Sequence, residues 1–342
     1  MPADSKQQPS LVEQIMQVGS GYLASISLNI AVRLEIADRL VAGPRPVADL
    51  ARETRTNDDA LYRMLRLLAA VGVFTESAPR TFANTPASDV LRADAPESCR
   101  DMLLWWCDPL HFRIYAELEH SIRTGETCVE KVLGMPIFDY FATDPRESEI
   151  FNNAMTSFSA QTVPAVVEAY DFGGIGTLID VAGGHGSVIG AVLERYPAMR
   201  GILCDLEHVV AGAGPTLGRF GVQDRCRTEV CNFFESVPTG GDAYIMKHII
   251  HDWNDEKALA ILRNIAAALG TKKGKVILIE AVVASGNEPH MAKFIDIEML
   301  ALPGGRERTE EEFRRLFERA GFRLTRVVPT KGPLCVVEAV RT

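Results

Sequence analysis

The spacing of apolar residues changes about halfway along this chain of 342 residues. Up to about residue 170 they recur mainly at helical spacing, and from about residue 176 short β-rich runs alternate with helical runs. This alternation predicts a parallel, doubly wound sheet with helices on both faces. The predicted strands cover residues 177–181, 200–204, 227–230, 242–246, 275–281, 323–328 and 334–340, and helices over 188–196, 256–269 and 310–320 separate most of them.

The last two predicted strands differ from the others. Only residues 329–333 lie between them, which is too short for a helical crossover. We therefore expect the final strand to run antiparallel to its neighbour. Sheets of this type bind ligands beyond the carboxyl ends of their strands, so the chemistry is expected just after each strand.

The first half of the chain has the element order of a winged helix. Residues 46–53 and 58–71 predict two helices, and residues 73–76 and 81–83 predict a hairpin. The would-be recognition helix carries or adjoins several arginines, as a DNA-binding protein would require; they are Arg52, Arg55, Arg63 and Arg66. The formal net charge of -9 at pH 7 repels a phosphate backbone, however. We interpret these arginines as solvated or paired with acidic neighbours, and expect the domain to pack against another subunit.

Composition favours a globular cytoplasmic protein, with 47% hydrophobic and 24% charged residues. The seven cysteines are scattered and form no C-x-x-C pair, which fits a reducing compartment. The polar start, residues 1–10, lacks the apolar stretch of a secretory signal and is interpreted as a flexible tail. Charged residues interrupt Tyr22–Val41, which predicts an amphipathic helix rather than a membrane span. We expect neither a membrane nor a nucleic-acid partner.

A glycine-rich turn follows the first predicted strand of the second half. Residues 178–187, L-I-D-V-A-G-G-H-G-S, lead from the strand into a helix, and the glycines allow a ligand to approach the backbone closely. A dinucleotide fingerprint uses the same geometry, but Ala182 and Ser187 occupy two of its three glycine positions. Asp205 ends the next strand, where a carboxylate can accept both hydroxyls of a ribose. Together these features favour a nucleoside ligand over a tight turn or a helix cap.

Residues 247–255, K-H-I-I-H-D-W-N-D, follow another predicted strand and carry the candidate base. The imidazole of His251 has a pKa suited to removing a proton near neutral pH. An isolated histidine here would more often begin or cap the following helix, but its position at the ligand edge of the sheet favours catalysis.

The segment G-G-R-E-R-T-E-E-E over residues 304–312 has both a structural and a functional interpretation. Thr309 and Glu312 have the spacing of a capping box, which predicts the start of a helix. Glu307 precedes that box and could orient an imidazole by a hydrogen bond, and Glu280 at the end of another strand is a second candidate.

Together these motifs resemble those of the class I O-methyltransferases, similar to plant caffeate and bacterial natural-product enzymes. The resemblance extends from the N-terminal helices to the C-terminus. Its specific parts are D-V-A-G-G-H-G, the C-D-L after the second strand, K-H-I-I-H-D-W-N-D-E, G-G-R-E-R-T, and F-D-Y-F-A-T-D-P-R over residues 138–146. The combination is far more specific than any one of these motifs.

The resemblance implies a Rossmann-like seven-stranded α/β domain over residues 171–342 that binds S-adenosylmethionine. It also implies a mainly helical, winged-helix-like dimerisation domain over residues 11–170 that contributes to the substrate pocket, and hence a homodimer. By resemblance the catalytic residues are His251, Glu280 and Glu307, and the pocket residues are Phe151, Met155, Trp253 and Met299. The cofactor-binding residues would be Asp180, Gly183, Gly184, Gly186, Asp205, Leu206, Asn232, Phe233 and Lys247.

Two positions depart from the pattern of this family. Ala182 stands where the usual loop has its first glycine, which we expect to cost little because alanine is nearly as small. Asn232 replaces the aspartate that contacts the adenine amino group. Its uncharged amide oxygen can still accept that hydrogen bond. We therefore expect the cofactor to bind, with lower affinity than an aspartate would give.

The function we expect is methylation of a hydroxyl on a small aromatic molecule of secondary metabolism, with S-adenosylmethionine as methyl donor. His251 would remove the hydroxyl proton as the oxygen attacks, and no metal is required. Two other classes remain as alternatives: an NAD(P)-dependent oxidoreductase, and a winged-helix regulator that senses a small molecule. The pattern does not name the methyl acceptor.

Overall fold

The computed structural model describes residues 10–342, and these form two compact units. One unit holds the chain up to Arg113 together with Arg146–Phe158, and the other holds Ile114–Pro145 with Ser159–Thr342. The boundary expected from sequence lies at residue 170, so the two divisions differ over residues 114–145 and 159–170. The functional roles of the two domains remain predictions.

The first helix of the first unit, α1 (Leu11–Arg33), begins with a capping box between Ser10 and Glu13. The expected tail over residues 1–10 otherwise lies outside the described residues. The amphipathic helix expected over Tyr22–Val41 is broken, because Glu35 adopts a left-handed conformation with φ of 55° and separates α1 from α2 (Ile36–Arg39). Among residues 10–342, α1 is the one helix long and apolar enough to cross a membrane, a test of length and composition that core helices of soluble proteins and signal sequences also pass.

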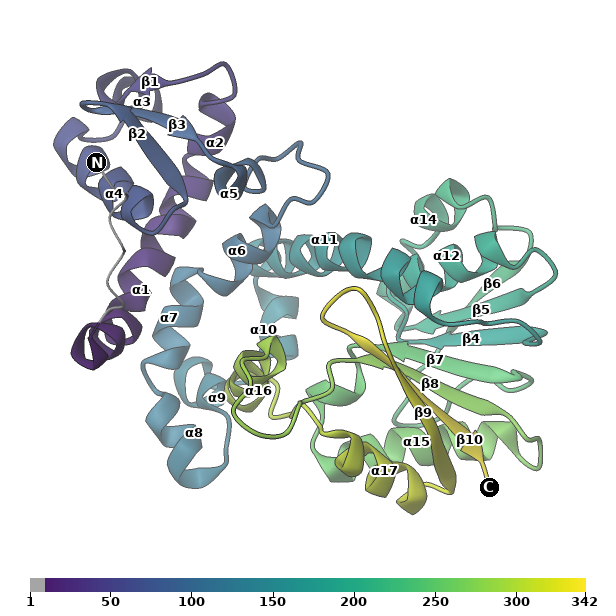
Figure 1. Ribbon diagram of the computed structural model, residues 1–342. Coiled ribbons are helices and arrows are strands. Elements are labelled where there is room, and N and C mark those ends of the chain that lie inside the picture. Colours follow the sequence, from purple (N-terminus) through teal and green to yellow (C-terminus); the bar gives the residue numbers. More distant parts are fainter. Residues whose placement is uncertain (1–9) are drawn as a thin grey trace, which may run out of the picture. The chain divides into compact units, whose positions relative to one another are not determined.

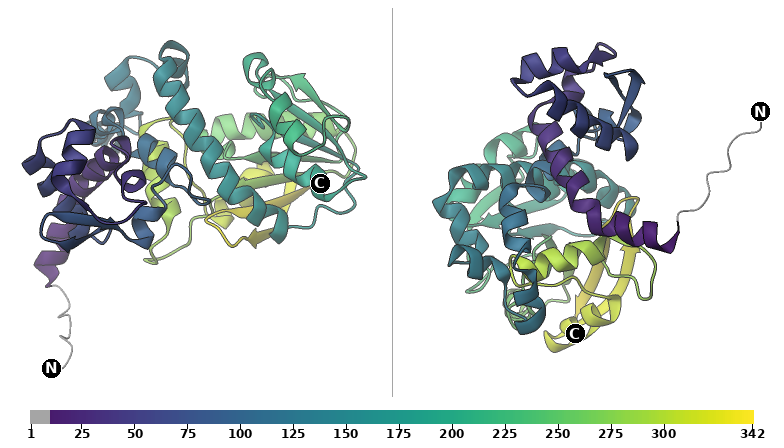
Figure 2. Two further views of the ribbon diagram at one scale, coloured as in Figure 1. Left: turned by 90° about the horizontal axis from the view of Figure 1, so that it is seen from above. Right: turned by 90° about the vertical axis from the view of Figure 1, so that its left-hand side faces the viewer.

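The winged-helix order predicted for the first unit is present. Helices α3 (Val47–Thr54) and α4 (Asp58–Ala70) precede the hairpin of β2 (Phe74–Ala78) and β3 (Thr81–Asn84). Strand β1 (Arg45–Pro46) pairs with β3 to complete a three-stranded sheet. Figure 2 (right) shows α1 extending from the group that these elements form.

The middle of the chain is a series of helices. Two of them, α7 and α11, contain residues of both units. The bounds are α5 (Pro86–Asp89), α6 (Arg100–Trp106), α7 (Pro109–Tyr115), α8 (Leu118–Thr124), α9 (Cys128–Leu133), α10 (Ile137–Thr143) and α11 (Pro145–Ala169).

The second unit contains the predicted seven-stranded sheet, with the strand order β6-β5-β4-β7-β8-β10-β9 (Figure 1). Strands β4 to β8 are parallel to one another. Strand β10 is antiparallel to β9, as the short connection between them predicted, and it is also antiparallel to β8. The bounds are β4 (Thr177–Val181), β5 (Arg200–Asp205), β6 (Cys226–Val230), β7 (Ala243–Lys247), β8 (Lys275–Glu280), β9 (Phe322–Pro329) and β10 (Cys335–Arg341).

Helices cover both faces of this sheet, which explains why its strands are apolar on both sides. On one face, alternate strand residues such as Ile179 and Tyr244 form a single buried core with the helices α15 (Asp255–Leu269) and α17 (Glu310–Arg319). The helix α12 packs on β4 and β5 (Figure 1). The remaining helices of the unit are α12 (Ser187–Arg195), α13 (Glu207–Val210), α14 (Gly214–Arg219), the 3-10 turn η1 (Ile250–Asp252), α15 (Asp255–Leu269), α16 (Met291–Ala301) and α17 (Glu310–Arg319).

Candidate active site

The glycine-rich loop joins β4 to α12 and lies over Asp180, the buried carboxylate near the end of β4. Oδ2 of Asp180 accepts a hydrogen bond from the backbone N–H of Ile189 at 3.3 Å. A Cβ atom on Gly183 would lie 2.5 Å from Asp180 Cγ and 2.5 Å from Leu203 Cδ1, so this position requires glycine. By contrast, a Cβ on Gly184 would meet nothing within 4 Å, which leaves the backbone open to a ligand there.

Ala182 follows β4 in a left-handed conformation, with φ of 55°. Its backbone N–H donates to the carbonyl of Cys204 at 2.8 Å, which holds the loop against β5. The argument from side-chain size missed this conformation, in which a Cβ costs about 1–2 kcal/mol relative to glycine. Replacing the usual glycine with Ala182 therefore introduces strain that the sequence argument did not anticipate.

Asp205 lies at the carboxyl end of β5, directly beside the glycine-rich loop. Its Oδ2 accepts the backbone N–H of Gly184 at 2.9 Å, and its Oδ1 accepts the backbone N–H of Leu206 at 2.7 Å. These bonds fix the plane of the carboxylate. Each oxygen retains a lone pair that can accept a hydroxyl of a ribose.

Asn232 is exposed in the loop after β6, where its side chain forms a local turn. Its Oδ1 accepts the N–H of Phe234 at 3.1 Å, and its Nδ2 donates to Glu235 at 3.0 Å. The carbonyl oxygen has a second lone pair for an adenine amino group. Phe233 packs edge-on against Trp253, with 6.2 Å between ring centroids, so the structure brings a predicted cofactor residue and a predicted pocket residue together.

Lys247 ends β7 and is the central positive charge at this edge of the sheet. Burial lowers the pKa of Lys247 to about 8, against the opposing charges of Glu280, Asp180 and Asp252. Burial also raises the pKa of Asp180 to about 7. The glycine-rich loop, the carboxylate of Asp205 and this lysine thus lie at the carboxyl edge of the sheet, where ligands of such folds bind.

His251 is buried in the turn η1, with carboxylates on several sides. Its Nδ1 lies 2.7 Å from Oε1 of Glu307 and 3.9 Å from Oε2 of Glu280, and its Nε2 lies 3.4 Å from Oδ1 of Asp252. Burial alone would lower the pKa of His251, but these three carboxylates outweigh it and raise the pKa to about 10. For the acid Glu280 burial acts in the opposite direction and raises the pKa to about 7.

Two buried side chains hold the turn that carries His251. Glu280 Oε1 accepts the N–H groups of Ile249 and Ile250 at 3.2 and 3.0 Å. Arg308, 1% exposed, donates to the carbonyls of Ile250 at 3.0 Å and Trp253 at 2.9 Å, and to Asp255 at 2.9 Å. The sequence carries no signal of this role for Arg308, since an arginine in so charged a segment is typically solvated.

Gly305 allows the segment containing Glu307 to approach this turn. A Cβ on Gly305 would lie only 1.9 Å from the carbonyl oxygen of His251, and the next residue, Arg306, donates its N–H to that oxygen at 2.8 Å. The predicted capping box of Thr309 and Glu312 is present and fixes the segment at the start of α17. These contacts explain how Glu307 comes within hydrogen-bonding distance of the imidazole.

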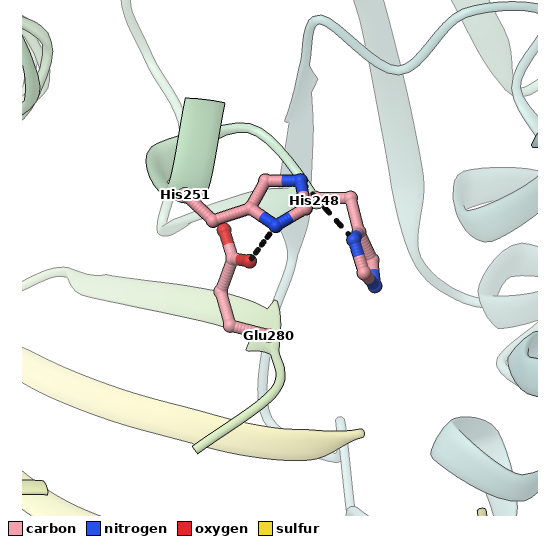
Figure 3. A group of neighbouring side chains, drawn as sticks. All are labelled: His248, His251 and Glu280. Atoms are coloured by element: carbon pink, nitrogen blue, oxygen red, sulfur yellow. Dashed lines mark hydrogen bonds and ion pairs between the residues drawn. The ribbon is translucent and has the colours of Figure 1, made fainter. Parts of the chain in front are cut away.

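A second histidine, His248, contacts the opposite side of the His251 ring (Figure 3). Nδ1 of His248 lies 3.2 Å from Nε2 of His251, and the rings are nearly perpendicular with centroids 4.4 Å apart. His248, His251 and Glu280 offer ligand atoms within 4.8 Å of one another. However, Glu280 lies beside Nδ1 of His251, whereas His248 lies beside Nε2. The three side chains therefore do not direct their ligand atoms at a single position for a metal ion.

The predicted pocket residues are divided between the two units. Phe151 and Met155 belong to the first unit, where Phe151 packs edge-on against Trp105 at a centroid distance of 5.2 Å. Trp253 and Met299 belong to the second unit. The indole of Trp253 contacts the aromatic rings of Phe138, Phe233 and Phe234, and Met299 is buried.

The fold and the arrangement of these residues define a class I methyltransferase. Its features are a glycine-rich loop after β4, an acidic residue at the end of β5, and the antiparallel strand β10 between β8 and β9. Residues 115–323 match the O-methyltransferase domain family, and residues 16–94 match the O-methyltransferase dimerisation domain family. The chain therefore belongs to the family of O-methyltransferases that carry this dimerisation domain.

Known proteins of natural-product biosynthesis are similar over nearly the whole chain. Phenazine O-methyltransferase PhzM of Lysobacter antibioticus is 40% identical over 325 residues, 95% of either chain. Mitomycin biosynthesis 6-O-methyltransferase of Streptomyces lavendulae is 36% identical over 331 residues, 96% of this chain and 94% of that one.

A solved structure extends the comparison to the cofactor. NcsB1, an O-methyltransferase from neocarzinostatin biosynthesis in complex with S-adenosylmethionine and 2-hydroxy-5-methyl naphthoic acid, has a TM-score of 0.80 and 30% identity, with coverage of 94% of this chain and 96% of that chain. The present chain is accordingly an O-methyltransferase of the natural-product type that uses S-adenosylmethionine. Methyl transfer, rather than hydride transfer or gene regulation, is the activity for which the matched domain and these relatives are named.

Proposed function

We propose that this enzyme methylates a hydroxyl group on a small aromatic molecule and that His251 removes the proton of that hydroxyl. The observation that carries the proposal is the 2.7 Å contact between Nδ1 of His251 and Glu307, which leaves Nε2 as the nitrogen that can take the proton. An aromatic acceptor is supported by the relatives named for phenazine and mitomycin chemistry and by the naphthoic acid in the NcsB1 complex.

We assign the cofactor contacts to the carboxyl edge of the sheet. The glycine positions 183, 184 and 186 would lie beneath the methionine portion, beside Asp180. The ribose hydroxyls would bind Asp205 next to Leu206, and the adenine amino group would bind Oδ1 of Asn232 next to Phe233. The ammonium group of Lys247 would bind a carboxylate or carbonyl oxygen of the cofactor.

The proposed reaction is a direct displacement. When bound, S-adenosylmethionine supplies a methyl group on a positively charged sulfur. The acceptor oxygen forms a bond to this methyl carbon as the carbon–sulfur bond breaks, and the hydroxyl proton moves to Nε2 of His251. Glu307 stabilises the resulting imidazolium through Nδ1, and Glu280 adds a second negative charge nearby.

The carboxylates around His251 suit it to phenolic acceptors. An ordinary histidine, with a pKa near 6.5, is a much weaker base than a phenolate, whose conjugate acid has a pKa near 10. The surrounding charges raise the pKa of His251 to about 10, which makes proton transfer from a phenol nearly balanced in free energy. Such a base requires no metal to activate the hydroxyl, so we propose a metal-independent reaction.

The substrate pocket remains an assignment by resemblance. We propose that Phe151, Met155, Trp253 and Met299 contribute apolar surface to an aromatic acceptor. Apolar residues of this kind bind flat rings through contact area and dispersion, which suits substrates as different as phenols, polyketides and phenazines.

We further propose that the enzyme is a homodimer in the cytoplasm. Several large apolar residues of α1 are exposed in the single chain: Leu11, Val12, Ile15, Met16, Val18, Tyr22, Leu23, Ile26 and Ile30. The matched dimerisation domain begins at residue 16, within this helix, which supports a second copy of the chain rather than a membrane as its partner. An apolar face on this scale is unfavourable in water until it is covered.

Calorimetric titration tests the cofactor assignment. The protein is titrated with S-adenosylmethionine, S-adenosylhomocysteine, NAD and NADP, and an Asp205→Asn variant serves as the matched control because it keeps the shape of the side chain. We expect the two sulfur nucleosides alone to bind the wild-type protein, and the variant to bind them more weakly. Binding of NAD or NADP instead would overturn the interpretation of the glycine-rich loop.

A further inference from the structure

His248 contacts the proposed proton-accepting nitrogen, as Asp252 does at 3.4 Å, and neither the motif pattern nor the mechanism above supplies a role for this histidine. It follows β7 directly, three positions before His251, and the turn η1 brings the two rings together. Nδ1 of His248 lies 3.2 Å from Nε2 of His251, which is hydrogen-bonding distance. The other nitrogen of His251 is bonded to Glu307, so the two contacts together fix the ring at both edges.

The chemistry of two neighbouring imidazoles determines which ring donates. A protonated His251 carries N–H groups at both nitrogens, so its Nε2–H can donate only to a lone pair. A neutral histidine has one such lone pair, and Nδ1 of His248 is in position to supply it. Burial, together with the positive charges of His251 and Lys247, holds the pKa of His248 well below its ordinary value, which keeps this second ring neutral.

We propose that His248 is a positioning residue for the base: its Nδ1 accepts the Nε2 proton of protonated His251 and yields that place to the acceptor hydroxyl when His251 is neutral. The proposal rests on the function proposed above for His251. It gives the Nε2–H of the buried imidazolium an acceptor at 3.2 Å, closer than Oδ1 of Asp252 at 3.4 Å, once the acceptor oxygen has become a methyl ether, since ether oxygens on aromatic rings are poor hydrogen-bond acceptors. Product release then leaves a charged ring that is fully hydrogen-bonded.

The backbone at His248 has a conformation that side chains rarely adopt. His248 has φ of 54°, in the left-handed region, and its N–H donates to the carbonyl of Ile279 at 3.1 Å. Histidine and asparagine are among the residues that enter this region more readily than most. The strained conformation directs the Nδ1 edge of the ring toward His251, a placement that a regular continuation of β7 would not provide, because successive side chains of a strand point to opposite faces.

The hydrogen bond that His248 accepts has a predictable effect on the acidity of His251. The charged groups that act on His251 are Asp252 on its own turn, Glu280 from β8 and Glu307 from the loop after α16. The positive charge of Lys247 from β7 acts on His248. An acceptor at Nε2 stabilises the protonated ring and so raises the pKa of His251 further. Removal of this acceptor should therefore lower the pKa, while the three carboxylates remain in place.

The test is a titration of His251 followed by NMR of its imidazole, with the signal assigned by comparison with His251→Asn. The holoprotein with S-adenosylhomocysteine is compared with His248→Ala, His248→Gly and His248→Asn. Glycine relieves the left-handed backbone, and Ala182 is evidence that this fold accepts alanine at φ of 55°. Asparagine keeps an acceptor oxygen close to the position of Nδ1. His290→Asn, at the start of α16, is the matched control.

We expect the acid dissociation constant of His251 to rise about tenfold or more in the alanine and glycine variants, since hydrogen bonds to charged groups are the strong ones. The asparagine variant and the control should stay near the wild-type value. An unchanged His251 titration in both deletion variants, or a change as large in His248→Asn, would overturn the proposal.

The pH profile of methyl transfer separates this proposal from the proposed function. If His251 is the base, the acidic limb of kcat/KM moves to lower pH in step with the NMR titration. If the NMR titration moves and the profile does not, the base assignment is wrong and the positioning role falls with it, although the hydrogen bond itself remains. A purely structural role for His248 would lower activity at every pH without moving the midpoint.

Discussion

Replacement of Glu307 by glutamine is the most informative change at this site. The glutamine keeps the length of the side chain and an oxygen that can accept the Nδ1 proton of His251, now 2.7 Å from Oε1 of Glu307. Only the charge is lost. Because the carboxylate favours the protonated imidazole, its removal lowers the pKa of His251 from the raised value of about 10.

The size of this effect follows from the kind of hydrogen bond that is changed. A hydrogen bond to a charged group contributes about 1.5–3 kcal/mol and a neutral one about 0.5–1.5 kcal/mol. The difference of about 1–1.5 kcal/mol corresponds to a fall of about one pH unit in the pKa of His251. The contribution of Glu280 remains, since its carboxylate lies 3.9 Å from the same nitrogen.

The assay is the pH dependence of kcat/KM with one phenolic acceptor. A base must be deprotonated to act, so the rate falls as the pH drops below the pKa of His251. In Glu307→Gln this acidic limb should move to lower pH by about one unit, and the plateau should fall because the base is weaker. Glu310→Gln, an exposed neighbour paired with Arg314, should leave the profile unchanged. An unmoved midpoint in a Glu307→Gln protein that still binds S-adenosylhomocysteine would refute this reasoning.

The remaining predictions concern the base, the cofactor, the glycine-rich loop and the buried arginine. His251→Ala should lower kcat by about 10²–10⁴-fold, with S-adenosylhomocysteine affinity retained in a calorimetric titration. Asp205→Ala should weaken S-adenosylhomocysteine binding about tenfold or more in the same titration, and an unchanged Kd would remove its assigned role. Ala182→Gly should raise the free energy of unfolding in urea by about 1 kcal/mol, because glycine relieves the left-handed strain. Arg308→Leu should lower that free energy by about 2–3 kcal/mol, since two buried carbonyls lose their donor; equal stability would show that the contacts are dispensable.

The sheet could be predicted because its physical signals are local. Buried strands such as Thr177–Val181 are short apolar runs bounded by turn residues, and the brief connection at 329–333 permits only an antiparallel return. Asp205 and the glycine-rich loop meet because parallel strands bring their carboxyl ends to one edge. The position of Glu307 in the loop before the capping box suggested that it could orient an imidazole, but only the family resemblance paired it with His251.

Other features depend on contacts that sequence spacing does not reveal. The left-handed residues Glu35 and Ala182 carry no signal of their own, because their conformation is imposed by the surrounding structure. Buried Arg308 donates its hydrogen bonds mainly to backbone carbonyls. Because every residue has such a carbonyl, the sequence does not reveal these partners. His248 did carry a signal: two histidines three positions apart after a strand can meet if the chain turns at once, as it does in η1.

Transfer of a labelled methyl group tests the central claim most directly. The enzyme is incubated with S-adenosylmethionine that carries a trideuterated methyl group and with a panel of phenolic, naphthoic and phenazine acceptors, with His251→Ala as the control. We predict that mass spectrometry will find the labelled methyl on a hydroxyl oxygen of at least one aromatic acceptor in the wild-type reaction, and about 10²-fold less of this product or lower in the control. Labelled methyl on nitrogen or carbon alone, or equal O-methylation by His251→Ala, would contradict the account.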